Sequence, residues 1–447
     1  MLSKSRLLLT IFGVYCVACV AYHVYEIGYF NWWQFTIAQR IQCTDVAAST
    51  DFDLSQYILP GLERIHGLRS TLPWWNGTWV GQVPFWRPLT SYGFLLEYRL
   101  LPDDRYDYWF IVTIISHLTF CSLLLLFTSK LTGRLSVGLL TIVIFAGSAV
   151  MSPAGIDQRY FELMGMPCPA CDVAFGDWKN QPEIWSGAAI LGSLTFALYR
   201  KWVGSILCSA VAVAFKENGW LTFPLLGLLL YGTGRWKETP RSVIAAYFAC
   251  IIALFLIRLN CGASVFYGYH YGHNNGWLAR YVYAAMTPYI STFFAITCAP
   301  VILGTGAFVA WRLSGWKTVW RVSFFILSLA LSITDIAVTQ KIDAITATYM
   351  QFSWGMYLGL SVTLYLWLYC AYCLLQVPNA RPMILALVGS VMLCSALFVS
   401  AAQVQVHVLY LAYAFRSILF SLALAGIGNE CIVWWTRAAN KRNSGLA

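Results

Sequence analysis

The stretch that decides the fold runs from Val203 to Tyr231 and reads VGSILCSAVAVAFKENGWLTFPLLGLLLY. Two apolar segments, Val203–Phe215 and Leu221–Tyr231, flank the polar residues Lys216–Gly219. Each segment is shorter than the roughly 20 apolar residues of an ordinary transmembrane helix. Non-helical polar backbone survives at membrane depth only where it is buried in protein or lines a watery cavity. We therefore expect a membrane-embedded helical protein in which this polar break faces the protein interior.

Apolar runs continue along the chain on both sides of this stretch. The other runs are Leu7–Tyr29, Tyr108–Thr128, Leu135–Met151, Ile184–Leu198, Val243–Leu259, Ile290–Ala310, Val322–Val338, Met350–Leu375, Met383–Val399 and Val408–Gly428. The first of them lacks a small-residue cleavage site, so it is interpreted as a transmembrane helix and not as a signal peptide. The sequence predicts an all-α polytopic membrane protein with about twelve transmembrane helices. Residues 1–447 are expected to form a single transmembrane domain.

The overall composition excludes the soluble classes of protein. Of the 447 residues 59% are hydrophobic, 16% aromatic and 11% charged. A soluble domain carries about 25% charged residues. A soluble enzyme, a disordered chain, a secreted disulfide scaffold and a coiled coil are therefore all excluded.

The distribution of basic residues predicts the topology. More than half of the 29 Lys and Arg residues fall in the N-terminal segment, the C-terminal segment and alternate loops, where Glu238 is the one clear acid. Cytoplasmic loops of membrane proteins carry such an excess of basic residues. We expect both termini inside. The net charge of +10 is thus a topology signal, and no nucleic-acid partner is expected.

Three long loops are expected on the outer face, at residues 30–107, 152–183 and 260–288. Loops longer than about 12–15 residues are usually functional. The first contains apolar residues at helical spacing around Leu54–Ile65 and again up to Leu101, between tryptophans and tyrosines. Such stretches are typical of amphipathic helices that lie in the membrane interface.

Asp51 and Asp53 in the first loop are the candidate catalytic residues. A carboxylate beside an apolar wall can have a raised pKa and act as a general base toward an acceptor hydroxyl. The alternative is that these acids lie in a solvated loop or cap a helix. No cofactor is expected. A divalent metal at Cys168 and Cys171 stays open as an alternative, although one CxxC pair is a weak signal.

Three motifs resemble those of the GT-C membrane glycosyltransferases. The first combines Asp51 and Asp53 with Trp86–Thr90, Phe94–Tyr98 and His117. The second is Ala214–Leu226, which contains Lys216 and Glu217, and the third is Thr348–Met350. The likeness is nearest to the transmembrane O-mannosyltransferases that carry TPR repeats and to related bacterial proteins. Here, however, Phe52 separates the two acids and the TPR repeats are missing.

The resemblance implies a sugar donor attached to a polyprenyl phosphate and a transfer that inverts the anomeric carbon. Asp51 or Asp53 would then be the base, and Arg87 and Lys216 would contact the leaving phosphate, which matches the affinity of cations for phosphate. By the same resemblance and by their position on the outer face, further candidates for substrate binding are Glu97, His117, Glu217, His270 and Tyr349. Membrane lipids are expected partners, and the acceptor stays open. The resemblance favours a bacterial inner membrane over the endoplasmic reticulum.

Plainer interpretations remain beside this one. Arg87 could be an interfacial arginine, and Lys216 with Glu217 could form a structural ion pair. The whole chain could be a non-catalytic subunit of a membrane complex that keeps the GT-C fold, since fold does not imply function. It could also be a twelve-helix transporter or flippase, although no half-to-half repeat is visible.

Overall fold

The computed structural model describes residues 58–77, 79–80, 85–100, 107–146, 181–261, 366–367, 369–371, 373–374, 377–400 and 409–426. Every regular element within these residues is a helix, which confirms the expected all-helical character for this part of the chain. Three of the described helices are long and apolar enough to cross a membrane, at Ile115–Thr132, Arg241–Asn260 and Pro378–Ala396. The predicted spans Leu7–Tyr29, Ile290–Ala310 and Val322–Val338, and most of Met350–Leu375, lie outside the described residues.

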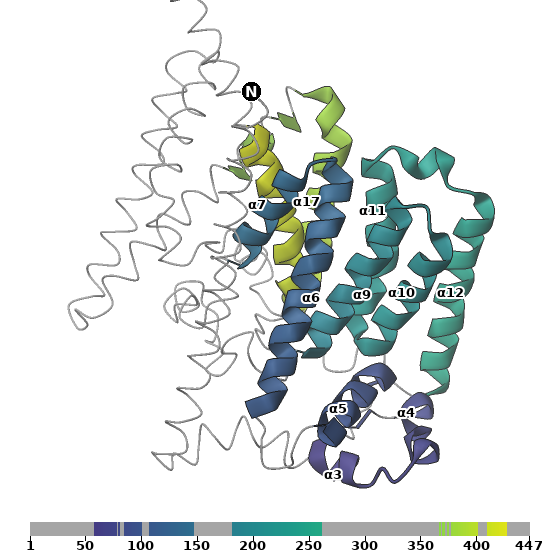
Figure 1. The fold of residues 1–447 in the computed structure, drawn as a ribbon. Coiled ribbons are helices and arrows are strands. Elements are labelled where there is room, and N and C mark those ends of the chain that lie inside the picture. Colours follow the sequence, from purple (N-terminus) through teal and green to yellow (C-terminus); the bar gives the residue numbers. More distant parts are fainter. Residues whose placement is uncertain are drawn as a thin grey trace, which may run out of the picture.

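The described helices form an upright bundle (Figure 1). It consists of α6 (Asp107–Thr132), α7 (Leu135–Ala146), α9 (Gln181–Leu198), α10 (Trp202–Phe215), α11 (Thr222–Gly232), α12 (Arg241–Asn260), α17 (Arg381–Ser400) and the helix Tyr410–Gly426. In the bundle α9 packs between α6 and α10, while α11 packs on α17. These boundaries agree within a few residues with the apolar runs of the sequence, because each helix ends where charged or turn-forming residues begin.

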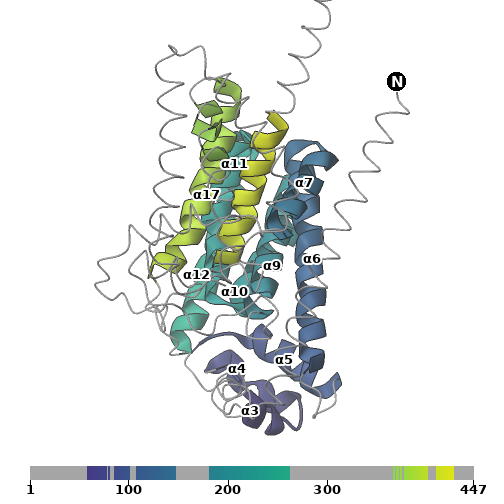
Figure 2. The same ribbon diagram turned by 90° about the vertical axis from the view of Figure 1, so that its left-hand side faces the viewer.

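A smaller layer of helices, which we call the cap, covers one end of the bundle (Figure 2). The cap comprises α3 (Leu59–Glu63), the 3₁₀ turn Leu68–Thr71, α4 (Pro73–Asn76) and α5 (Pro88–Leu100). Of the expected helix around Leu54–Ile65, residues 54–57 lie outside the described part of the chain, and the rest is present as α3, which ends at Glu63, two residues earlier than predicted. The second expected helix is present as α5, which begins at Pro88 and so has proline in its most favourable position.

The cap is attached to the bundle by a buried tryptophan and a helix cap. Trp86 is 1% exposed and packs against Val213 of α10 and Leu254 of α12. The hydroxyl of Thr90 donates a hydrogen bond of 2.5 Å to the carbonyl of Phe215, the last residue of α10. This bond satisfies one of the carbonyls that a helix leaves unpaired at its C-terminus. The end of α10 is therefore held under the first turn of α5.

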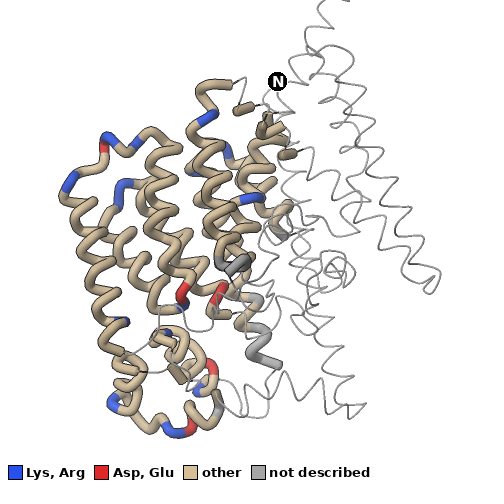
Figure 3. The backbone as a smooth tube through the Cα atoms, turned by 180° about the vertical axis from the view of Figure 1, so that it is seen from behind, with Lys and Arg blue, Asp and Glu red and all other residues tan. Residues whose placement is uncertain are grey.

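The opposite end of the bundle, which we call the basic end, collects positive charge (Figure 3). The connections α6–α7, α9–α10 and α11–α12 all turn there, because consecutive helices run in opposite directions. They carry Arg134, Arg200, Lys201, Arg235 and Lys237, and Glu238 is the acid among them. The cap and these basic connections thus lie at opposite ends of the described bundle.

Hydroxyl groups join α9, α10 and α12 inside the bundle. The Ser193 hydroxyl lies 3.0 Å from that of Ser205 and 2.9 Å from that of Ser209, and all three side chains are buried. Tyr247 of α12 donates to the Ser205 hydroxyl at 2.6 Å. Small polar side chains let helix backbones approach closely and hydrogen-bond between helices in apolar surroundings. The bundle is therefore fixed in register independently of the site at its cap end.

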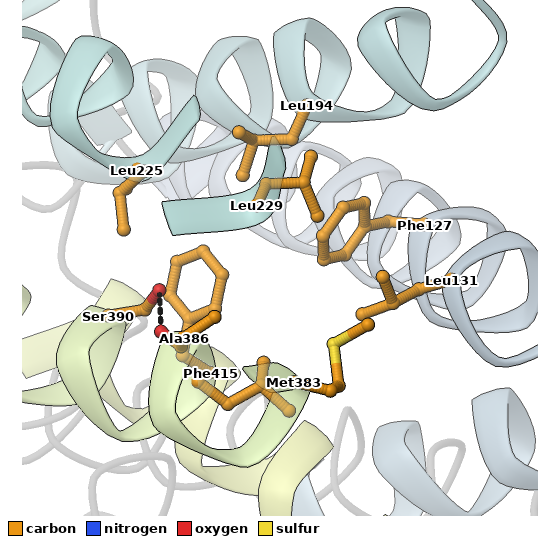
Figure 4. Close-up of a pocket in the computed structure, with 10 residues that line it drawn as sticks. Phe127, Leu131, Leu194, Leu225, Leu229, Met383, Ala386, Ser390 and Phe415 are labelled. Atoms are coloured by element: carbon orange, nitrogen blue, oxygen red, sulfur yellow. Dashed lines mark hydrogen bonds between the residues drawn. The ribbon is translucent and has the colours of Figure 1, made fainter. Parts of the chain in front are cut away.

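A small apolar pocket lies between α6, α9, α11, α17 and the Tyr410–Gly426 helix (Figure 4). Ser390 is the one polar residue that lines it, and its hydroxyl donates to the carbonyl of Ala386 in the same helix. Ligand pockets need a few converging polar groups for orientation and specificity. The hydroxyl of Ser390 is already bonded within α17, so the described lining of this pocket is apolar in character.

Candidate functional site

The turn between α10 and α11 places the charged residues of the opening stretch at the junction with the cap. Lys216 adopts an extended backbone, its N–H donates to the carbonyl of Ala212 at 3.1 Å, and a 3₁₀ turn follows over Glu217–Leu221. A Cβ atom on Gly219 would overlap the backbone of Ala212 and Val213. Only glycine lets the turn fold back against the last turn of α10. Lys216, Glu217 and Asn218 are thereby all buried.

Arg87 and Glu217 form a forked ion pair across this junction. Arg87 Nε donates to both carboxylate oxygens of Glu217, at 2.9 and 3.1 Å, and Nη2 donates to Oε2 at 2.5 Å. Arg258 near the end of α12 lies 3.8 Å from the other oxygen of the same carboxylate and is fully buried. The side chain of Arg87 is 12% exposed and that of Glu217 is 5% exposed. Arg87 is thus the member of this triad that remains accessible from outside.

Two aromatic rings support the guanidinium of Arg87. Its central carbon lies 4.1 Å from the centre of the Phe85 ring and 5.2 Å from that of Trp79. Cations over aromatic faces at such distances gain additional electrostatic stabilisation. The indole N–H of Trp79 is buried and has no hydrogen-bond partner among the described residues. The Trp86–Thr90 motif therefore places the guanidinium of Arg87 against two aromatic rings, which shield most of it from water.

The charges of the triad keep Glu217 ionised. Burial alone would raise the pKa of this carboxyl. The charge and hydrogen bonds of Arg87, together with the charge of Arg258, outweigh burial and hold its pKa below the usual range. Glu217 is therefore a fixed negative charge between two arginines.

Lys216 pairs with a different carboxylate. Its ammonium contacts Glu183, which lies in the first turn of α9 and is 1% exposed on its side chain. The amide of Asn218 donates to the other oxygen of Glu183 at 2.7 Å. The adjacent residues Lys216 and Glu217 therefore point to partners on two other elements and do not pair with each other. Through these ion pairs the turn is joined to α9, to α12 and to the residue that precedes α5.

Glu183 and Asn218 belong to this site but were not among the residues that the sequence singled out. The sequence treated Glu183 as the end of the second outer loop, whereas α9 already begins at Gln181. The available signal was its position directly before an apolar run, where an unpaired acid would be costly. Its partner could not be inferred, because 33 residues separate it from Lys216 in sequence.

Glu97 occupies a second buried polar contact, where α5 meets α6 and α9. The amide of Gln181 donates to Glu97 at 3.1 Å and to the hydroxyl of Thr113 at 3.0 Å. Glu97 is 4% exposed, and its Oε1 has no hydrogen-bond partner among the described residues. Burial raises the pKa of this carboxyl to about 8, although the hydrogen bond from Gln181 opposes the rise. Glu97 is therefore protonated at neutral pH.

A pH series on Glu97→Gln tests this state. The unfolded carboxyl ionises near 4.5 and the folded one near 8, so the folded state binds the extra proton between these values and wild-type stability falls as pH rises across them. Glu97→Gln removes this loss. Between pH 5 and 8 we expect the variant to gain on the order of 3 kcal/mol relative to wild type. Denaturant unfolding in detergent micelles measures it. If the free energy of unfolding changes with pH in the same way in both proteins, Glu97 is not protonated in the folded state. The control is Glu63→Gln, which changes an exposed acid of the cap.

His117 lies apart from the charged pairs, within the span formed by α6. Its Nδ1 is 2.8 Å from the hydroxyl of Tyr410 and its Nε2 is 3.5 Å from the sulfur of Cys121. Its ring stacks on Phe145 at 6.0 Å. The side chain is 4% exposed and joins α6 to the Tyr410–Gly426 helix. These contacts of His117 are with α6, α7 and the Tyr410–Gly426 helix, whereas Arg87 and Glu217 meet at the cap.

The other candidate residues fall outside the described part of the chain. These are Asp51, Asp53, His270 and Tyr349, together with Cys168 and Cys171. Within the described ranges, no group of three or more His, Cys, Asp or Glu residues is arranged to hold a metal ion. Of the candidates from the sequence, the structure brings Arg87, Lys216 and Glu217 into one junction, with Glu97 in a neighbouring contact between α5 and α9.

Comparisons of this chain with protein-family models, with curated proteins and with solved structures found no match.

Proposed function

We propose that the chain is a multi-pass membrane glycosyltransferase of the GT-C type, which transfers a sugar from a polyprenyl-phosphate-linked donor at the extracytoplasmic face of a bacterial inner membrane. The observation that carries the proposal is the meeting of two distant motifs. Trp86–Thr90 and Lys216–Gly219 are more than 120 residues apart, and the pair Arg87–Glu217 joins them. Both motifs belong to the resemblance with the GT-C enzymes.

The junction brings cations to the place where an anionic donor would bind. Arg87, Arg258 and Lys216 lie there beside Glu217 and Glu183. A cation in a water-poor site attracts a phosphate more strongly than it would in water. Arg87 is the cation that an anion can approach, since Lys216 and Arg258 are more deeply buried.

The proposed reaction divides the chemistry between the first loop and the junction. The carboxylate of Asp53 or Asp51 takes the proton of the acceptor hydroxyl, whose oxygen forms a bond to the anomeric carbon of the sugar. The bond from that carbon to the phosphate oxygen breaks on the opposite face. The polyprenyl phosphate leaves with the bonding electrons, and Arg87, the more exposed of the two cations that the resemblance assigns to the phosphate, stabilises its charge.

The proposed topology places the cap outside and the basic end in the cytoplasm. The α6–α7, α9–α10 and α11–α12 connections support this orientation, because their basic residues all lie at the end opposite to the cap. With about twelve spans, both termini would then be cytoplasmic.

A second candidate function is that of a non-catalytic subunit which keeps the same fold. The observation in its favour is that Arg87 and Lys216 are each already paired with an internal carboxylate. Such pairing is what a purely structural network requires.

A complementation experiment separates the two candidates. We expect glycan products that are lost on deletion of the gene to return with the wild-type chain and with Glu63→Gln, but not with Asp51→Asn/Asp53→Asn expressed at equal level. Mass spectrometry of the glycans is the readout. Full activity of the double variant would refute the catalytic assignment. Stable co-purification with a larger complex, without turnover of lipid-linked sugar, would favour the subunit. Saturable solute uptake into proteoliposomes would instead indicate a transporter.

A further inference from the structure

The cap exposes a surface that combines apolar and basic side chains. Leu68 and Leu72 are 82% and 56% exposed, and Leu96 and Leu100 on the outward side of α5 are 60% and 71% exposed. Arg64, Arg69 and Arg99 are exposed on the same small layer. We call these seven residues the leucine–arginine surface. They do not belong to the buried junction, and the proposed reaction does not use them.

The depth of the cap relative to the membrane follows from α12. This helix has 20 residues and ends at Asn260, so it rises about 30 Å, which is the thickness of the hydrocarbon core. The thiol of Cys261, the next residue, donates to the carbonyl of Trp75 in the cap at 2.9 Å. Trp75 therefore lies at the level where the hydrocarbon ends and the headgroups begin. Trp75 is 37% exposed, and tryptophan is enriched at this depth of membrane proteins.

Trp75 connects this depth to the rest of the cap. Its indole N–H donates to the hydroxyl of Tyr92 on α5 at 3.3 Å, and the same hydroxyl lies 2.7 Å from that of Thr71. Leu72 and Leu68 belong to the segment that Thr71 fixes, and Leu96 follows Tyr92 by one turn of α5. The leucine–arginine surface is thus held close to the membrane boundary by hydrogen bonds to a residue at that boundary.

The charge of the surface selects the kind of lipid. The surface has three exposed arginines, whereas Glu63 is the one exposed acid of the described cap. Interfacial segments with leucine beside arginine bind membranes through buried apolar area together with attraction to anionic lipids. We propose that the leucine–arginine surface docks on anionic phospholipids of the leaflet that borders the cap, with the leucines at acyl depth and the arginines on headgroup phosphates.

Hydrogen–deuterium exchange of the full chain in nanodiscs tests this proposal. One set of discs contains phosphatidylcholine alone, and the other contains phosphatidylcholine with phosphatidylglycerol. We expect slower amide exchange in residues 58–77 and 94–100 in the anionic discs. Each arginine near an anionic surface contributes about five-fold to the affinity for anionic lipid. Arg64→Gln/Arg69→Gln should therefore lower the affinity of the cap for anionic lipid about 25-fold and abolish most of the slower exchange in the anionic discs. Arg200→Gln/Lys237→Gln at the basic end is the matched control and should exchange as slowly as wild type in these discs.

A second variant tests the apolar half of the surface. Leu68→Ser/Leu72→Ser changes side chains that are more than half exposed, so the fold does not depend on them. We expect faster exchange of the same residues in both kinds of disc. Equal exchange of the wild-type cap in the two kinds of disc would overturn the proposal. Protection that appears only in discs holding two copies of the chain would also overturn it, since a second copy would then occupy the surface.

Discussion

Glu217→Gln is expected to lower the free energy of unfolding by about 3–5 kcal/mol. The variant keeps the size and part of the hydrogen bonding of the side chain but removes its charge. Arg87 and Arg258 would then face each other within a buried junction without the carboxylate that lies between them. Loss of one partner from a buried ion pair is costly because the remaining charge has already lost its water. Denaturant unfolding of the purified chain in detergent micelles measures the change.

The ion pair Arg200–Glu238 provides a matched control at the basic end. Its shortest nitrogen–oxygen distance is 2.5 Å, the same as in Arg87–Glu217, but its side chains are 63% and 56% exposed. Exposed pairs contribute about 0–1 kcal/mol, so Glu238→Gln should change stability little. If the two variants lose equal stability, the buried triad does not have the energetic role that its geometry indicates. The double variant Arg87→Gln/Glu217→Gln should recover part of the loss, because it removes one of the uncompensated cations.

Gly219→Ala is expected to be the other severe substitution, with a loss of about 3 kcal/mol or more. The added methyl group would overlap the backbone of Ala212 and Val213, which cannot move without breaking the last turn of α10. That turn also carries the carbonyl of Phe215 to which Thr90 donates. A shift here therefore separates the cap from the bundle as well as straining the turn. Thermal unfolding in micelles and protease sensitivity of the cap are the measurements.

Gly227→Ala is the control for this substitution. Gly227 lies inside α11, and a Cβ atom there would meet nothing within 4 Å. Alanine favours a helix over glycine by about 1 kcal/mol, so this variant should be neutral or more stable. A Gly219→Ala protein as stable as Gly227→Ala would show that the turn has room that the structure does not indicate.

The helices of the described bundle were largely predictable from the sequence, since apolar runs are bounded by charges and turn residues. Val203–Phe215 and Val243–Leu259 differ from α10 and α12 by two residues or fewer at each end. The burial of Lys216 and Glu217 was also expected, because polar backbone at that depth must face protein. The hydropathy pattern thus predicts that Lys216 and Glu217 each need a partner of opposite charge inside the protein.

The identity of those partners was not predictable. A structural pair between the adjacent residues Lys216 and Glu217 was one interpretation, yet each pairs with a residue far away in sequence, Glu183 or Arg87. Hydropathy records where a helix lies in the membrane but carries no information about how it is rotated or which helix it faces. Glu183 was overlooked for this reason, whereas Arg87 was found through its motif.

The crossed pairing of the turn has a consequence for how the chain is made. Ribosomes deliver the N-terminal part first, and domains assemble in that order during synthesis. Arg87 and Glu183 both precede the turn, so the counter-charges of Lys216 and Glu217 are already present when these residues emerge. Arg258 is delivered later and joins a carboxylate that is already neutralised. Lys216 and Glu217 can therefore enter the membrane together with residues of opposite charge. Arg258 of α12 joins them afterwards.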